Sequence, residues 1–377
     1  MSAPLVWTAI GIVAVLSLVV AGFARRGMGT GASEFFLGGR RLKGFVSGMT
    51  YAATTYSAFM LVGLVGLTYR SGVGALGFEM TYLLFTILFL VVFGPRFWLI
   101  GRRYDHITPP EVLAERYESR AVARIAAIIS FFMLVPYASA QLIGAGRLVE
   151  GLSGGSIPYM AGVGIMAAVA AFSALYAGMR SVAWTDALQG LVMIATSLSA
   201  LAVISFQFFG TPMDFVRTIE TQPPDLLRFT WTPELFIGLT LPWAFFALTN
   251  PQVSQRMMVP DRAVSLKRMI MYFAIFGFIY TIVSTLFGFQ AAHIVPNLEN
   301  PDQAMPALLA RLHPALAMVI FIGIFAAASS TLGSILLTLS SLSSRDVFGK
   351  RKAESDEARQ TLVGQISVVF LLAICIV

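Results

Sequence analysis

Charged residues are scarce in this chain, and their scarcity indicates the class of protein. Only 12% of its 377 residues are Asp, Glu, Lys or Arg, whereas 57% are hydrophobic. A soluble domain carries about 25% charged residues. Long apolar runs recur along the chain, and each has about the 20 residues that cross a bilayer. The sequence therefore predicts an all-α polytopic membrane protein, since the short alternating segments of a membrane β-barrel are absent from it.

Cysteine and histidine are also rare. The single Cys375 excludes a disulfide within the chain and a cysteine-rich metal site. The three histidines, His106, His293 and His313, lie far apart and give no zinc-ligand spacing. No nucleophile, base and orienting group occur at a recognisable spacing, so we expect no enzyme activity and no organic cofactor.

The apolar runs predict ten membrane spans. They cover residues 4–24, 45–69, 74–99, 121–147, 157–177, 183–208, 234–252, 265–291, 314–343 and 361–377. A basic pair, Arg25 and Arg26, follows the first run and no basic residue precedes it, which is the reverse of a secretory signal. We expect a retained first span with its N-terminus outside. The last run ends with the chain, which we interpret as a fragment of a longer protein.

The distribution of basic residues supports this topology. With the N-terminus outside, 21 of the 26 Lys and Arg residues fall in inner loops and helix ends, Arg256 among them, and five fall outside. This split follows the positive-inside rule. We therefore interpret the net charge of +7 as an orientation signal and expect no nucleic-acid partner. A single transmembrane domain, 1–377, in the cell membrane is predicted, in contact with lipid.

One span is unusually rich in hydroxyls. Residues 325–344 read FAAASSTLGSILLTLSSLSS and carry nine of them, at Ser329, Ser330, Thr331, Ser334, Thr338, Ser340, Ser341, Ser343 and Ser344. Such hydroxyls often bond back to the carbonyl one turn earlier, and small residues let helices approach closely. Several neutral oxygens also suit a monovalent cation when unwound backbone adds carbonyls. A second hydroxyl-rich segment, 47–66, is expected to unwind, and Pro242 and Asn250–Pro251 are expected to break the seventh span.

Glu79 and Asp186 lie within predicted spans, where ionisable groups are costly and are functional by default. The alternative for Glu79 is a carboxylate that faces the bundle and pairs with a backbone group or a hydroxyl. The alternative for Asp186 is a carboxylate at the interfacial start of a helix, near its positive dipole end.

Five stretches together resemble the sodium:solute symporter family, which includes sodium/proline, sodium/pantothenate and sodium/sugar transporters. They are SEFFLGGRRL (33–42), TPPEVLAERYESR (108–120), ALYAGMRSVAWTDALQG (174–190), NPQVSQRMM (250–258) and AAASSTLGSILLTLSSLSSRDVF (326–348). The resemblance implies a five-plus-five inverted-repeat transporter core. An extra first helix (4–24) would precede a first repeat (45–208) and an incomplete second repeat (234–377), with the C-terminal part missing.

The resemblance also implies a site for a transported sodium ion. Carbonyls of Ala53, Tyr56 and Ala327 and hydroxyls of Ser330 and Thr331 match the family's ligands. The other seven hydroxyls of 325–344 are assigned to helix packing and back-bonding. Asp186 falls in the family's WTD motif, which places it on the cation pathway.

Positions of the family's solute site match less well. They are Thr55, Ser57, Phe59, Gly63, Glu79, Trp243, Ala247 and Pro251. Thr55 and Ala247 replace an aspartate and a tyrosine of sodium/proline transporters, whereas Glu79 falls where sugar-transporting members have a glutamate. The implied pocket is more apolar, which argues against proline, leaves a sugar unproven and leaves a carboxylate or amino-acid solute open.

The sequence therefore predicts a sodium-coupled symporter that imports a small organic solute by alternating access. One alternative is a transporter-like sensor module of a larger signalling protein, because some members of the family are fused to histidine kinases. Another is a proton-coupled transporter with Asp186 or Glu79 as the proton carrier.

Overall fold

The computed structural model describes residues 2–220, 224–349 and 357–376, and this part of the chain is almost entirely helical. The long helices are α1 (Ala3–Arg25), α5 (Val73–Arg103), α7 (Arg120–Leu152), α8 (Tyr159–Phe209), α14 (Ala263–Ile294), α16 (Pro314–Leu342) and α17 (Glu357–Ile376). Shorter α-helices are α2 (Ala32–Leu37), α3 (Gly44–Thr55), α4 (Gly63–Ser71), α6 (Pro109–Arg116), α9 (Pro212–Glu220), α10 (Pro224–Leu227), α11 (Pro233–Ala244), α12 (Phe246–Thr249), α13 (Pro251–Ser254) and α15 (Ala304–Ala310). The single-turn elements are η1 (Gly38–Arg40), η2 (Ala58–Met60), η3 (Gln255–Met258), η4 (Pro301–Gln303) and the π-helical η5 (Ser343–Val347).

Eight helices in the described residues are long and apolar enough to cross a membrane, and α3 with η2–α4 forms a ninth span that is bent by 61°. A shorter apolar stretch, Pro233–Thr249, covers α11 and α12. Each of the ten predicted spans overlaps one of these segments, although the seventh is shorter than a complete span. The all-α polytopic fold is confirmed, and no β-strand occurs among the described residues.

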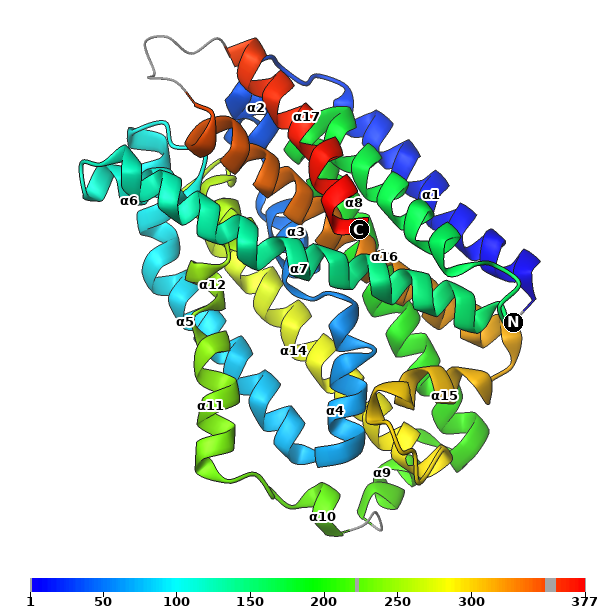
Figure 1. Cartoon of the computed structure of the whole chain (residues 1–377). Coiled ribbons are helices and arrows are strands. Elements are labelled where there is room, and N and C mark those ends of the chain that lie inside the picture. Colours follow the sequence, from blue (N-terminus) through cyan, green and yellow to red (C-terminus); the bar gives the residue numbers. More distant parts are fainter. Residues whose placement is uncertain (1, 221–223, 350–356, 377) are drawn as a thin grey trace.

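Helix α8 contains two spans, 159–176 and 178–209, which turn at Gly178. Gly178 has φ +53°, and a Cβ there would collide with the Phe35 carbonyl, so the turn requires glycine. Both spans then lie against the same turn of α16. Ser334 bonds Asp186 in the second span, and a Cβ on Gly333 would lie 3.7 Å from the Ala170 carbonyl in the first. The two halves are therefore antiparallel neighbours (Figure 1).

Two spans are broken, as the sequence predicts, and each break has a local cause. Helix α3 ends at Thr55, because Tyr56 and Ser57 are extended, and the Ser57 hydroxyl then accepts a hydrogen bond from the Phe59 N–H, at 3.2 Å. In the seventh span Asn250 is extended at φ −90° and ψ 109°. A residue before proline avoids the helical region, so Pro251 explains this break.

Helix α16 is the core of the bundle. Its most apolar stretch is 72% buried, against 22–50% for the other candidate spans of the described residues. Helices α8, α7, α1 and α3 all contact it, and it passes through the middle of Figure 1. The hydroxyls of this helix therefore face protein, which explains how an apolar span tolerates them.

The loops separate into two groups at opposite ends of the bundle, in the alternation that the basic residues predict. Contacts at the basic end are Arg40–Asp105, Arg102–Pro260, Arg180–Gly27 and Arg345–Glu111. At the other end Tyr69 donates to the Val295 carbonyl, and Phe209 packs on His293. Which end faces the cytoplasm stays a prediction.

Candidate functional site

The broken end of α3 meets the middle of α16. The Ser330 hydroxyl donates to the Ala53 carbonyl at 2.9 Å and to the Ala327 carbonyl at 3.0 Å, and the Thr331 hydroxyl lies 3.3 Å from the Ala53 oxygen. All four residues are at most 2% exposed. Carbonyls in the last turn of a helix have no partner within that helix, so the break leaves the Ala53 oxygen free for another ligand. The structure thus brings together four of the five predicted sodium ligands.

Tyr56, the fifth predicted ligand, lies at the break itself. Its N–H still donates to the Ala52 carbonyl, at 2.8 Å, while its ring packs at 5.9 Å against Phe273 and against Phe276 of α14. No hydrogen bond joins it to Ser330 or Thr331 in the described part of the chain. Its role as a ligand stays a prediction that depends on its carbonyl.

Asp186 lies one helical turn from these oxygens and is buried. It is 1% exposed, and it accepts hydrogen bonds from Thr50 at 2.6 Å and from Ser334 at 3.2 Å. The guanidinium of Arg256 pairs with it at 3.4 Å. The alternative of an interfacial carboxylate at a helix start is therefore wrong, because the hairpin at Gly178 brings Asp186 into the bundle core.

Arg256 is a functional candidate that the sequence analysis missed. It is counted there as an inner-loop charge, yet its side chain is fully buried. It donates to Thr50 at 3.0 Å and to the Gln252 carbonyl at 2.6 Å, and it also donates to Ser334. The signal in the sequence was its place just after the Asn250–Pro251 break, which turns the chain inward. We refer to Thr50, Asp186, Arg256 and Ser334 as the charged layer.

The charged layer and the predicted sodium ligands both include residues of α3 and α16. Thr50 is one turn before Ala53 in α3, and Ser334 is one turn after Ser330 in α16. Thr54 bonds Ser334 at 2.8 Å and fastens the helices between the two levels. A displacement of α3 relative to α16 therefore alters both levels together.

A second polar layer lies further toward the basic end. The Gln255 side chain accepts from Thr338 at 2.9 Å and donates to Ser341 at 3.0 Å and to the Ile107 carbonyl at 3.1 Å. Among the described residues, the bonds of Ser343 match the predicted back-bonding, to the Leu339 carbonyl. Ser329 and Ser341 also bond back, to the Ala326 and Thr338 carbonyls. Five of the hydroxyls assigned to packing and back-bonding contact other elements: Ser329, Ser334, Thr338, Ser341 and Ser344.

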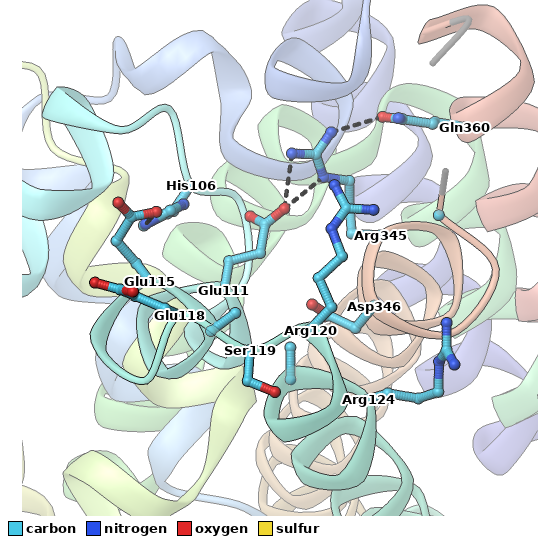
Figure 2. A pocket seen from close by; sticks show the side chains of 13 residues that line it. His106, Glu111, Glu115, Glu118, Ser119, Arg120, Arg124, Arg345, Asp346 and Gln360 are labelled. Atoms are coloured by element: carbon cyan, nitrogen blue, oxygen red, sulfur yellow. Dashed lines mark hydrogen bonds and ion pairs between the residues drawn. The ribbon is translucent and has the colours of Figure 1, made fainter. Parts of the chain in front are cut away.

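An ion pair at the basic end closes the same side of the bundle. Arg345 of η5 binds Glu111 of α6 at 2.7 and 2.9 Å and donates to Gln360 of α17 at 2.9 Å, as Figure 2 shows. A cavity of about 270 Å³ surrounds this pair, with Arg120 on its wall. Three levels of polar contacts therefore separate the predicted sodium ligands from the basic end.

Five of the eight predicted solute positions line one small cavity beside the broken α3. The cavity measures about 90 Å³, and those positions are Thr55, Ser57, Phe59, Glu79 and Trp243. Gly63 instead lines a neighbouring cavity of about 700 Å³, which Ser57 and Phe59 also border. Ala247 and Pro251 line neither cavity and are buried in α12 and α13.

The larger cavity extends away from the basic end. Its wall near the other end of the bundle includes Arg147, which is 72% exposed, and Asp302. Its innermost part is lined by Ala328 of α16 and by Ser57. A solute that enters from this end therefore reaches the break in α3 without passing the polar layers.

Glu79 faces the bundle interior and has no partner among the residues that the structure describes. It is 2% exposed, and within the described chain its carboxylate makes neither a hydrogen bond nor an ion pair. The alternative in which Glu79 pairs with a backbone group or a hydroxyl is therefore not what the structure shows.

Comparisons with known proteins find related transporters along nearly the whole chain. The model of the sodium:solute symporter family matches residues 35–377. The chain is 28% identical to the sodium/pantothenate symporter of Escherichia coli (strain K12) over 370 residues, covering 96% of this chain and 76% of that protein. It is 25% identical to an osmoregulated proline transporter of Bacillus subtilis (strain 168) over 379 residues, covering 97% and 76%. A solved structure of a sodium-coupled sialic acid symporter, in a substrate-bound outward-open state, has the same fold, with a TM-score of 0.82 and 20% identity over 99% of this chain and 79% of that one.

Proposed function

Because this chain belongs to the sodium:solute symporter family, we propose that it imports a small organic solute together with sodium by alternating access. The chain is a multi-pass integral membrane protein, which we place in the cell membrane with its N-terminus outside. The observation that carries the proposal is the convergence of the Ser330 and Thr331 hydroxyls on the carbonyl of Ala53, where α3 ends.

Sodium is the cargo that this arrangement fits. Its ligands are neutral, hard oxygens, two of them supplied by backbone at a helix break. The charge of Arg256 would repel a cation one turn away, but Asp186 neutralises it at 3.4 Å. Sodium bound to α3 and α16 together holds these helices in one relative position. Its inward movement is driven by its gradient and by the membrane potential, which contributes about 2.3 kcal/mol per charge for each 100 mV.

The distribution of cavities and polar layers supports an outward-open arrangement. The cavity of about 700 Å³ lies toward the outer end, while the charged layer, the Gln255 layer and the Arg345 pair lie toward the inner end. Inward opening requires these contacts to separate. Because the charged layer and the sodium ligands share α3 and α16, release of sodium and opening of the inner side are coupled through the same helix movement.

Uptake into proteoliposomes tests the proposed function. The purified protein is exposed to a panel of radiolabelled carboxylates, amino acids, sugars and amines under an inward sodium gradient, and potassium replaces sodium in the control. We expect accumulation of at least one solute that requires sodium. Accumulation driven equally by a proton gradient without sodium would support the proton-coupled alternative and contradict this proposal.

A further inference from the structure

The small cavity beside the broken α3 combines aromatic walls with one carboxylate that has no partner in the described part of the chain. Tyr56, Phe59, Phe78, Tyr82 and Trp243 line it together with Glu79. The Trp243 ring contacts three of the other rings, with centroids at 5.8 Å from Tyr82, 6.4 Å from Phe78 and 6.5 Å from Phe59. The rings therefore form one continuous wall rather than isolated contacts.

Both features attract positive charge. The face of an aromatic ring is negative, and rings arranged around a cavity are the usual recognition site for quaternary and methylated ammonium groups. A carboxylate removed from water keeps its charge only when a cation or hydrogen-bond donors stabilise the charged form. Glu79 is 2% exposed and has no such partner in the described residues. An incoming cation would supply the missing charge.

The size of the cavity limits what enters. An apolar cavity of about 150 Å³ holds benzene, and a water molecule occupies about 30 Å³. The cavity of about 90 Å³ therefore fits an ammonium group with small substituents but not the ring of a hexose. A hexose would also bury several hydroxyls, whereas the Thr55 hydroxyl is already bonded to the Tyr51 carbonyl at 2.7 Å.

We propose that the solute is an organic cation whose ammonium group, primary or quaternary, binds between this aromatic wall and Glu79. This inference rests on the proposed function, because the cavity is part of the same transport site. The rest of the solute extends into the larger cavity, whose lining is mostly apolar and includes the buried Gln141, 6% exposed and without a partner among the described residues. A solute carboxylate is disfavoured beside Glu79, because like charges repel at close range.

Competition binding tests the inference. Radiolabelled choline and, separately, radiolabelled butylamine are bound to the purified protein in sodium buffer, and the competitors are unlabelled choline, its neutral isostere 3,3-dimethyl-1-butanol, unlabelled butylamine, 1-butanol and butyrate. We expect each cation to compete at least about tenfold better than the neutral compound of its shape. Choline and butylamine distinguish quaternary from primary ammonium. Equal competition by 3,3-dimethyl-1-butanol, or stronger competition by butyrate, would overturn the inference.

Two variants test whether Glu79 and the rings cause the preference for cations over neutral compounds. Glu79→Gln keeps the shape of the side chain and is expected to lower choline affinity by about tenfold or more, as is Trp243→Leu. Glu220→Gln, at the exposed end of α9, is the matched control and should bind choline normally. Binding of radioactive sodium is measured on the same samples. If the unmodified protein binds sodium but neither choline nor butylamine, the inference alone is contradicted. If the unmodified protein does not bind sodium, the proposed function is contradicted.

Discussion

Removal of the Arg256 charge should destabilise the protein strongly, because Asp186 would remain buried without a cation. Both side chains are at most 2% exposed. Removing one partner of a buried ion pair typically costs about 3–5 kcal/mol, since the other charge is left uncompensated. Asp186 would keep its bonds from Thr50 and Ser334, which replace only part of that interaction. Arg256→Met is therefore expected to lose stability in this range.

A double variant separates the charge effect from lost packing. Arg256→Met with Asp186→Asn removes both charges, so its loss of stability should be smaller than that of Arg256→Met alone. Arg147→Met is the matched control, because its pair with Glu150 is largely exposed and exposed pairs contribute about 0–1 kcal/mol.

Thermal unfolding of the purified protein in detergent measures these differences. At roughly 2 °C per kcal/mol for a chain of this size, Arg256→Met should lower the midpoint by roughly 6–10 °C. The double variant should recover a large part of that shift, and Arg147→Met should change it little. The single variant Asp186→Asn is measured as well. A double variant whose loss of stability equals the losses of Arg256→Met and Asp186→Asn added together would refute the reasoning, because the charges would then not be coupled.

Two further predictions concern the frame around the site. Gly178→Ala should destabilise the protein by about 2 kcal/mol or more, since the φ of +53° and the collision of a Cβ with the Phe35 carbonyl both oppose a side chain. Gly164→Ala, where a Cβ meets open space, should be neutral in the same thermal assay. Equal effects of the two substitutions would contradict the account. Arg345→Met should cost about 1.5–3 kcal/mol through its charged bonds to Glu111, whereas Arg120→Met on the same cavity wall should not. An Arg345→Met variant as stable as the unmodified protein would show that this pair contributes little to closing the basic end.

Local chemistry explains what the sequence predicts well. The apolar runs determine where spans begin and end within a few residues, and proline chemistry places a break at Asn250–Pro251. The break in α3 is predicted for the segment 47–66 but not at Tyr56, because no proline marks it and the Ser57 cap becomes visible only in the folded chain. The resemblance to the family, and not residue spacing, predicts that four residues come together: Ala53, Ala327, Ser330 and Thr331.

Pairing between distant segments could not be predicted. Asp186 and Arg256 are 70 positions apart, and their contact depends on the hairpin at Gly178 and on the inward turn after Pro251. A count of basic residues by loop therefore places Arg256 at the surface. In the same way, the lack of a partner for Glu79 among the described residues depends on all the helices around it, which no single stretch of sequence encodes.

Binding of radioactive sodium to the purified protein tests the central claim most directly. The variant Ser330→Ala with Thr331→Ala removes both hydroxyls at the Ala53 carbonyl, while Ser343→Ala removes a hydroxyl that bonds back within its own chain segment. Each lost ligand to a cation is comparable to a hydrogen bond to a charged group, about 1.5–3 kcal/mol, so the double variant should bind sodium at least about a hundredfold more weakly and Ser343→Ala should bind it normally. Equal sodium affinity in the unmodified protein, the double variant and Ser343→Ala would show that the ion is held elsewhere.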